Sequence, residues 1–266
     1  MKNVFERYEI THLSQSSINL FLTNIPLFIV RYLHKIKDPT NSKMLRGTVS
    51  DMFICRSLGF EKTEDEEGKT KWTKTKEKLS EEDLGDRAEK YFKTAMQDLE
   101  DDGGFINEMC MVKGYVKAGS DFYKKKKVIS VQKKIELDFE IDIPVIGYCD
   151  LEMSKEVRDI KTTNRTPSKL PDQVSRQIAV YATALNKPRA YADYIVGNQR
   201  GYNIRTFECD DLNMRIDEIY RICMAMQNLL GNNDIKSLVE QFYPDFSDWQ
   251  WSPKTIESAR KIWSIK

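Results

Sequence analysis

Apolar residues in the first 120 positions recur mostly at intervals of three and four, the spacing of one helix face. Ser or Pro residues that favour helix starts precede several of these segments. We expect helices over residues 14–25, 26–37, 42–58, 80–99 and 105–118. Between residues 61 and 78 the apolar content collapses, so this stretch is expected to be a solvated loop.

After residue 127 the pattern changes to that of strands. The segments 128–140, 145–153 and 156–162 carry β-branched residues, and the last two flank a Ser-Lys turn, which predicts a hairpin. Beyond it we expect a helix over 171–186, strands over 190–197 and 202–208 with a turn between them, and helices over 210–230 and after residue 253. This order predicts an α/β fold with a mixed central sheet flanked by helices. We expect an N-terminal helical region over 1–120 and a core with C-terminal helices over 121–266, integrated into one domain.

Composition excludes a membrane protein. Of the 266 residues 40% are hydrophobic and 31% are charged, and no run approaches the roughly 18 to 20 apolar residues of a membrane span. The N-terminus lacks the apolar core of a signal peptide, so the expected location is cytoplasmic, meaning the host cytoplasm if a phage encodes the chain. The net charge of +1 by itself predicts no partner.

Cysteine and histidine usage narrows the possible chemistry. The five cysteines include no C-x-x-C pair, and their odd number argues against a complete disulfide framework, so free thiols are expected. An iron–sulfur cluster or a structural zinc site is not expected. Only His12 and His34 are available for a histidine-based site, and neither has an obvious partner nearby.

The segment GYCDLEMSKEVRDIKT, residues 147–162, carries the candidate chemistry. In a hairpin, Asp150 on the first strand lies opposite or diagonal to Asp159 on the second, and Lys161 projects to the same face as Asp159. Two carboxylates suit Mg²⁺ or Mn²⁺, which activate water and bind phosphate oxygens. An Asp-x-Lys on an exposed strand is commonly a solvated face, but the apolar neighbours here predict burial, where unpaired charges are costly.

These residues resemble the PD-(D/E)XK nuclease superfamily, and specifically its RecB-like exonuclease branch. That branch carries Gly-x-x-Asp, then Asp-x-Lys, then Gln-x-x-x-Tyr on the following helix. The chain matches this order with Gly147 to Asp150, Asp159 to Lys161, and Gln177 to Tyr181. Gln177 and Tyr181 are one helical turn apart and share a face. The resemblance implies a restriction-endonuclease-like core in which Asp150, Asp159, Lys161, Gln177 and Tyr181 are catalytic.

The resemblance extends upstream, to the segment from Leu13 to Ile18 and to Arg46-Gly47-Thr48-Val49-Ser50-Asp51, which is similar to the family's Arg-Gly-x-x-x-His. Asp51 stands where the family often has a histidine ligand, and a carboxylate is still a hard ligand for Mg²⁺ or Mn²⁺. The implied metal ligands are Asp51, Asp150, Asp159 and the backbone carbonyl of Ile160. Whether Asp51 or Glu136 ligates the metal stays open.

Cations near these motifs are candidates for phosphate contact, although lysine runs are usually solvated. The expected DNA-binding residues are Lys124, Lys125, Lys126, Lys127, Arg165 and Arg176. The candidates for stacking on unpaired bases are Tyr115, Tyr123, Trp72 and Phe122, although aromatic residues at this density are more often core.

The leading functional prediction is a Mg²⁺- or Mn²⁺-dependent DNA exonuclease in recombination, repair or phage genome processing, without an iron–sulfur cluster. It resembles phage recombination exonucleases and the mitochondrial genome maintenance exonuclease. The alternatives are a structure-specific endonuclease on the same fold and a catalytically silent DNA-binding protein. The expected partner is DNA with linear ends, single- or double-stranded, together with a recombination or single-strand-binding protein; no membrane is expected. The sequence leaves digestion polarity and oligomeric state open.

Overall fold

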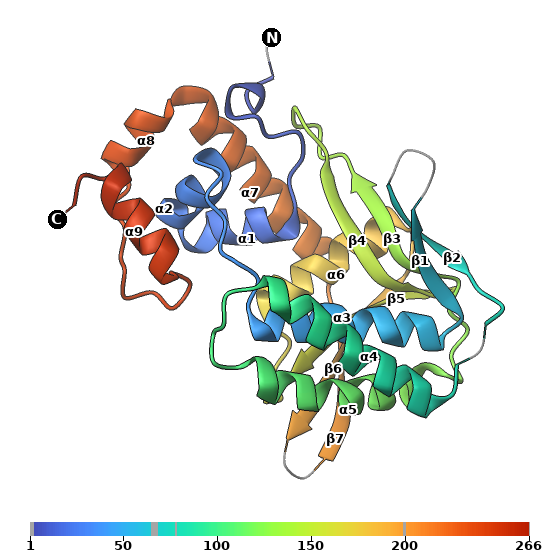
Figure 1. Ribbon diagram of the computed structural model, residues 1–266. Coiled ribbons are helices and arrows are strands. Elements are labelled where there is room, and N and C mark those ends of the chain that lie inside the picture. Colours follow the sequence, from blue (N-terminus) through green and yellow to red (C-terminus); the bar gives the residue numbers. More distant parts are fainter. Residues whose placement is uncertain (1–2, 65–68, 78, 199–200, 266) are drawn as a thin grey trace. The chain divides into compact units, whose positions relative to one another are not determined.

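The computed structural model describes residues 3–64, 69–77, 79–198 and 201–265. Within them a mixed five-stranded sheet has the order β3-β4-β5-β6-β7, and a separate two-stranded sheet pairs β1 with β2 (Figure 1). The strands are β1 (Phe60–Glu64), β2 (Thr70–Lys74), β3 (Ser130–Leu137), β4 (Val145–Glu152), β5 (Glu156–Thr163), β6 (Arg189–Asn198) and β7 (Gly201–Glu208).

The centre of the large sheet is the hairpin that the sequence predicts. β4 and β5 are antiparallel, and Leu151 pairs with Arg158. β6 pairs in parallel with β5 over the whole length of β5, and helix α6 (Asp172–Ala184) forms the connection between them. β6 and β7 are again antiparallel. The expected α/β fold with a mixed central sheet, flanking helices and N-terminal helices is therefore confirmed.

The chain divides into two compact units. The first contains residues 1–38, 135–147 and 211–266, and the second contains residues 39–134 and 148–210. The expected division into 1–120 and 121–266 stays a prediction. The helices of the first unit are η1 (Glu6–Tyr8), α1 (Gln15–Thr23), α2 (Ile25–Phe28), the π-helix η2 (Ile29–Leu33), α7 (Leu212–Asn232), α8 (Ile235–Gln241) and α9 (Pro253–Ile262).

The second unit holds the helices α3, α4 and α5, which lie side by side (Figure 1). Their bounds, with the short η3, are α3 (Ser42–Ser57), α4 (Glu81–Ala95), η3 (Met96–Asp98) and α5 (Phe105–Tyr123). The side chains of Asn41 and Ser80 accept the backbone N–H of Met44 and Asp83, which caps the starts of α3 and α4. Residue 123 ends α5, five residues later than the sequence predicts.

Apolar packing against the sheet fixes α3 and α5. One core cluster joins residues of both helices to residues of the strands, and its buried members are Ile54, Cys55, Phe60, Tyr115, Tyr123, Val131, Leu151, Met153, Ile160 and Ile195. Burial of such side chains contributes about 1.5 to 3 kcal/mol each. The cluster therefore gives α3 and β5 a fixed mutual position, which matters for the site below.

The expected loop over 61–78 is wrong for residues 61–64 and 70–74, because β1 and β2 form an antiparallel hairpin there, whereas residues 69 and 75–77 lie in no helix or strand. Buried Phe60 anchors β1 in the core cluster, and Trp72 on β2 packs against the same cluster. The polar residues of the two strands are paired across the hairpin in a regular antiparallel register, in which Lys62 lies opposite Trp72 and Thr63 lies opposite Lys71. Residues 65–68 and 78 lie outside the described residues.

All five cysteines are free thiols, and four of them are buried, as expected; Cys110 is exposed. No helix within the described ranges combines the length and the apolar character that a membrane span needs.

Candidate active site

The register of the β4–β5 hairpin brings the first two carboxylates together. Because Leu151 pairs with Arg158, Asp150 and Asp159 occupy the next positions of the two strands and share one face. Asp159 is only 1% exposed. Its Oδ2 lies 2.8 Å from the Lys161 Nζ, two residues further along β5. The structure thus brings Asp150, Asp159 and Lys161 into one cluster, as the alternation of the strands predicts.

Asp150 is held by two hydrogen bonds. Its Oδ2 accepts the backbone N–H of Ile160 at 2.7 Å, and its Oδ1 accepts Nε2 of Gln132 at 2.9 Å. Burial raises the pKa of Asp150 to about 7, and the Asp159 carboxylate adds to the rise, against the opposing effects of Lys161 and the two hydrogen bonds. The site therefore disfavours a full set of negative charges.

Asp51 on α3 belongs to the same electrostatic cluster. Burial raises its pKa well above the usual range, and Asp150 and Asp159 raise it further, while Lys161 acts in the opposite direction. Its Oδ1 is buried and has no hydrogen-bond partner among the described residues. A buried carboxylate oxygen without a partner costs free energy, and in native structures such a group calls for an explanation, such as an ion.

Lys161 connects the carboxylates to helix α6. Burial lowers its pKa, but the charges of Asp159 and Asp150 outweigh this effect, and the pKa is raised. Its Nζ donates to Gln177 Oε1 at 3.2 Å, and Gln177 Nε2 donates to the Tyr181 hydroxyl at 2.7 Å. Burial and the carboxylates raise the pKa of Tyr181, so its hydroxyl stays neutral. The two helix residues therefore orient the Lys161 ammonium.

The donor set fits a hard divalent cation. Within the described ranges no group of three or more His, Cys, Asp or Glu side chains is already assembled to hold an ion. The unpartnered Asp51 oxygen and the raised pKa values of Asp51 and Asp150 nevertheless mark a place that lacks positive charge. Carboxylate oxygens are the ligands that Mg²⁺ and Mn²⁺ prefer. The roles of Asp51, Asp150, Asp159 and the Ile160 carbonyl as ligands stay predictions, and so does the alternative of Glu136, which is exposed on β3.

Arg46 holds the end of β5 and was not singled out as a site residue by the sequence. It forms a buried ion pair with Glu108 of α5. Its guanidinium also donates to the backbone oxygen of Thr162 at 3.0 Å and to the Asn164 side chain at 3.3 Å. Arg46 therefore ties α3 and α5 to the residue that follows Lys161. The Arg-Gly pair at 46–47 was the available signal, but its contact lies 116 positions away.

Gln132 is the second residue that the sequence analysis missed. It lies on β3 with a φ of 47°, a left-handed conformation that is uncommon for a non-glycine residue. Such conformations cluster at functional sites, where the surrounding structure holds them. No sequence pattern signals it, because its partner Asp150 lies 18 positions away on another strand.

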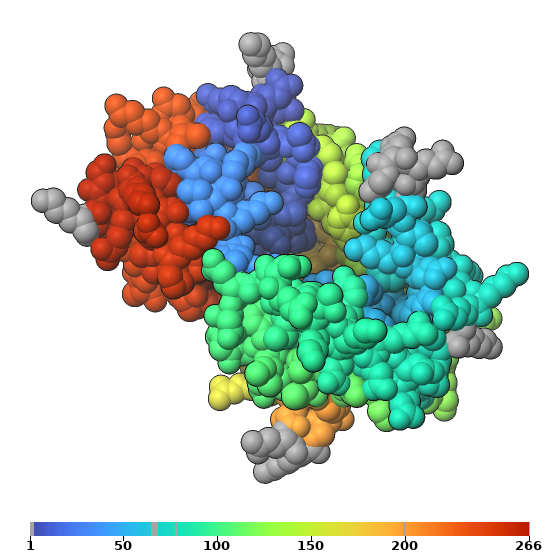
Figure 2. Space-filling model, in the orientation of Figure 1, coloured from blue at the N-terminus to red at the C-terminus, as the bar shows by residue number. Residues whose placement is uncertain are grey.

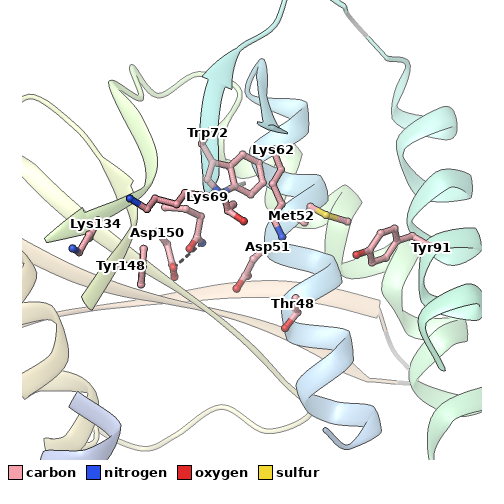
Figure 3. A pocket seen from close by; sticks show the side chains of 12 residues that line it. Thr48, Asp51, Met52, Lys62, Lys69, Trp72, Tyr91, Lys134, Tyr148 and Asp150 are labelled. Carbon is pink, nitrogen blue, oxygen red and sulfur yellow. Dashed lines mark hydrogen bonds between the residues drawn. The ribbon is translucent and has the colours of Figure 1, made fainter. Parts of the chain in front are cut away.

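A cavity of about 750 Å³ opens beside Asp51 and Asp150 (Figure 3). Side chains from α3, α4, β3, β4 and the β1–β2 hairpin surround it. They are Thr48, Asp51, Met52, Lys62, Lys69, Thr70, Trp72, Tyr91, Gln132, Lys134, Tyr148 and Asp150. The hairpin and α4 also reach the surface next to each other, in cyan and teal, in Figure 2.

The expected DNA-binding cations lie elsewhere in the structure, and their role stays a prediction. Lys124 is paired with Asp121 at 2.6 Å, and Lys126 lies over the Phe122 ring. Lys125, Lys127 and Arg165 are exposed, whereas Arg176 is buried. The cations that line the cavity are Lys62, Lys69 and Lys134.

Comparisons with known proteins relate the fold to that of a solved structure. No family model matches the sequence, and no curated protein matches it. The chain is similar to the crystal structure of a protein from Eubacterium rectale named "Putative exonuclease", with a TM-score of 0.57 and 13% identity, over 93% of this chain and 88% of that chain. A structure named SSO0001 aligns with a TM-score of 0.36 and 14% identity over 77% and 94% of the two chains, too low to indicate a shared fold. The first likeness shows a fold shared with that protein.

Proposed function

We propose that this protein is a Mg²⁺- or Mn²⁺-dependent deoxyribonuclease that hydrolyses phosphodiester bonds at the Asp51, Asp150, Asp159 and Lys161 cluster. The observation that carries the proposal is the buried Oδ1 of Asp51, which has no hydrogen-bond partner in the described part of the chain and belongs to a cluster with two further carboxylates and one lysine. The order of motifs typical of RecB-like PD-(D/E)XK nucleases and the similarity to the Eubacterium rectale protein support it.

Each side chain of the cluster has a distinct part in this reaction. Asp51, Asp150 and Asp159 would hold the cation, which supplies a Lewis acid and a bound water of lowered pKa. Lys161 keeps its proton, because the adjacent carboxylates raise its pKa. Its ammonium therefore stabilises the negative charge of the pentacovalent transition state. Gln177 and Tyr181 position that ammonium through their hydrogen bonds.

Digestion from DNA ends, in recombination, repair or phage genome processing, is the activity that we propose for this cluster. It is tested with end-labelled linear DNA and covalently closed circular DNA, each incubated with Mg²⁺, with Mn²⁺ or with EDTA. We expect metal-dependent loss of the linear substrate alone. Cleavage of the circles would identify an endonuclease, and an absence of metal-dependent cleavage of either DNA would contradict the proposed function.

A further inference from the structure

One face of the β1–β2 hairpin is turned toward the candidate active site. Lys62 and Trp72 are direct cross-strand partners, and Thr70 lies two residues from Trp72 on the same strand. All three line the cavity that Asp51 and Asp150 also line (Figure 3). Lys71 and Thr63 are paired on the opposite face of the hairpin. The hairpin thus gives the cavity an aromatic ring and an ammonium side by side.

Trp72 is held in place and is not fully covered. It packs against the core cluster of α3, α5 and the sheet, yet it is only partly buried, and the indole borders the cavity. Tyr148 borders the same cavity from β4 and is 55% exposed. An aromatic ring of this kind, fixed on one side and open on the other, is a stacking platform for a nucleobase.

Side chains of both charge signs border the cavity. Lys62, Lys69 and Lys134 border it from the hairpin and from β3, while Asp51 and Asp150 border it from α3 and β4. Ammonium groups bind the phosphates of a nucleic acid strand, and carboxylates do so only through a cation. This arrangement fits a nucleic acid strand with a phosphate on Lys62, in the cavity that the carboxylates also line.

We propose that the inner face of the β1–β2 hairpin, formed by Lys62, Thr70 and Trp72, is a nucleotide-binding subsite for unpaired DNA. A base stacks on the Trp72 indole and the adjoining phosphate binds the Lys62 ammonium. Stacking on Trp72 requires a free base face, and within a duplex neighbouring base pairs cover both faces of every base except those of the terminal pairs. The substrate of the site is therefore single-stranded DNA. This inference rests on the proposed nuclease function for its biological sense, but the binding itself does not require the chemistry.

Binding in EDTA tests the subsite without cleavage. The anisotropy of a short fluorescein-labelled oligothymidylate and of a blunt duplex is measured with the full chain and with Trp72→Ala, Trp72→Phe, Lys62→Ala and Lys71→Ala. We expect Trp72→Ala to weaken oligothymidylate binding about 10-fold, as loss of one stacked base does. Trp72→Phe keeps most of the affinity. Lys62→Ala lowers the slope of log affinity against log salt by about 0.7, the value for one phosphate of a single strand. Lys71→Ala, on the outer face, changes neither.

Two outcomes would overturn the subsite. In the first, Trp72→Ala and Lys62→Ala bind oligothymidylate as tightly as Lys71→Ala does. In the second, Trp72→Ala weakens binding of the duplex as much as binding of the single strand. Circular dichroism confirms that each variant is folded, and Lys62→Ala tests the same face without removing a side chain that packs on the core. If the chain shows Trp72-dependent binding but no metal-dependent cleavage, the nuclease function fails and the subsite stands. If it cleaves DNA and the Trp72 and Lys62 variants bind normally, only the subsite fails.

Discussion

Consecutive residues of β5 carry two charge clusters that differ in how completely they are neutralised. Arg158 donates to both carboxylate oxygens of Asp193 at 2.9 Å, and Asp193 also accepts the hydroxyls of Tyr123 and Thr206. We call these four residues the Asp193 network. Asp159, the next residue, points to the opposite face of the strand. It belongs with Asp51, Asp150 and Lys161, which we call the Asp159 cluster.

The different degree of charge neutralisation indicates a structural role for the Asp193 network and a chemical role for the Asp159 cluster. In the Asp193 network one guanidinium and two hydroxyls donate hydrogen bonds to a fully buried carboxylate, so this carboxylate needs no ligand to satisfy it. In the Asp159 cluster three carboxylates share one ammonium, and an Asp51 oxygen is left without a partner among the described residues. Natural proteins retain such a destabilising arrangement where function requires it. The unneutralised cluster is therefore the candidate site, and the neutralised one is a support for the sheet.

The largest expected effect of a single change is on activity in the Asp159 cluster. Lys161→Ala removes its only ammonium, and we expect cleavage to fall on the order of 10³-fold with the fold retained. The matched control is Lys187→Ala, which also removes a lysine paired with a carboxylate, that of Glu152 at 2.9 Å. The test is to measure the DNA cleavage rates of both variants and of the wild type with Mg²⁺. Equal rates for Lys161→Ala and the wild type would remove Lys161 from the reaction.

The next largest effect is on stability in the Asp193 network. Asp193→Ala removes one of two ion-pair partners of the buried Arg158 guanidinium and leaves Glu156 at 2.8 Å, so we expect the free energy of unfolding to fall by about 3 kcal/mol, the lower end for a broken buried pair. Thr206→Val removes one hydrogen bond and is expected to cost about 1 kcal/mol. Urea unfolding measures both losses. Cleavage by Thr206→Val should equal that of the wild type, and a large loss of activity there would mean that the network takes part in the chemistry.

These clusters show which parts of the site a sequence encodes locally. The hairpin of β4 and β5 was predictable from its turn and its β-branched residues, and the period of a strand then places Asp159 and Lys161 on one face. The pair Gln177 and Tyr181 was predictable because residues four apart share a helix face. Short spacings with a fixed geometry carry this information. The structure confirms that each of these pairs shares a contact or a face.

The rest depends on contacts that no local pattern encodes. Gln132, whose backbone is left-handed, meets Asp150 across 18 positions, and Arg46 meets Thr162 across 116 positions. The β1–β2 hairpin was missed because Phe60 and Trp72 are its main apolar residues, and its other positions read as a solvated stretch. Tertiary packing of two aromatic side chains decides the structure of that segment.

A smaller effect is expected when one carboxylate of the Asp159 cluster is neutralised, with opposite consequences for protein stability and for cleavage. Asp51→Asn replaces a buried carboxylate, whose pKa burial raises, with a neutral amide of the same shape. We expect the free energy of unfolding in EDTA to rise by about 1 kcal/mol, because the cost of a buried charge is removed. Metal-dependent cleavage should fall in the same variant. Asp193→Asn is the control, since there the same change must destabilise the protein. A decrease in stability for Asp51→Asn would mean that its carboxylate is already satisfied.

The smallest expected effect is a pH dependence of stability that arises from Glu152 on β4. Glu152 lies two residues from Asp150, and its pKa is shifted in the opposite direction. Burial would raise its pKa, but hydrogen bonds from Lys133, Ser130 and Lys187 outweigh burial and lower the pKa of Glu152 from 4.5 to about 2. A lowered pKa in the folded state means stability that is present above the ordinary pKa and is lost as pH falls through the folded value. Glu152→Gln should therefore be less stable than the wild type at neutral pH, by about 1 kcal/mol or less because Lys133 is 44% exposed. That difference should shrink as the pH falls from about 4.5 toward 2.

Urea unfolding at neutral pH and in acid measures this difference in stability, with Glu100→Gln on the exposed surface as the control. A difference that is constant with pH would show that the lysines do not stabilise the charged form of Glu152.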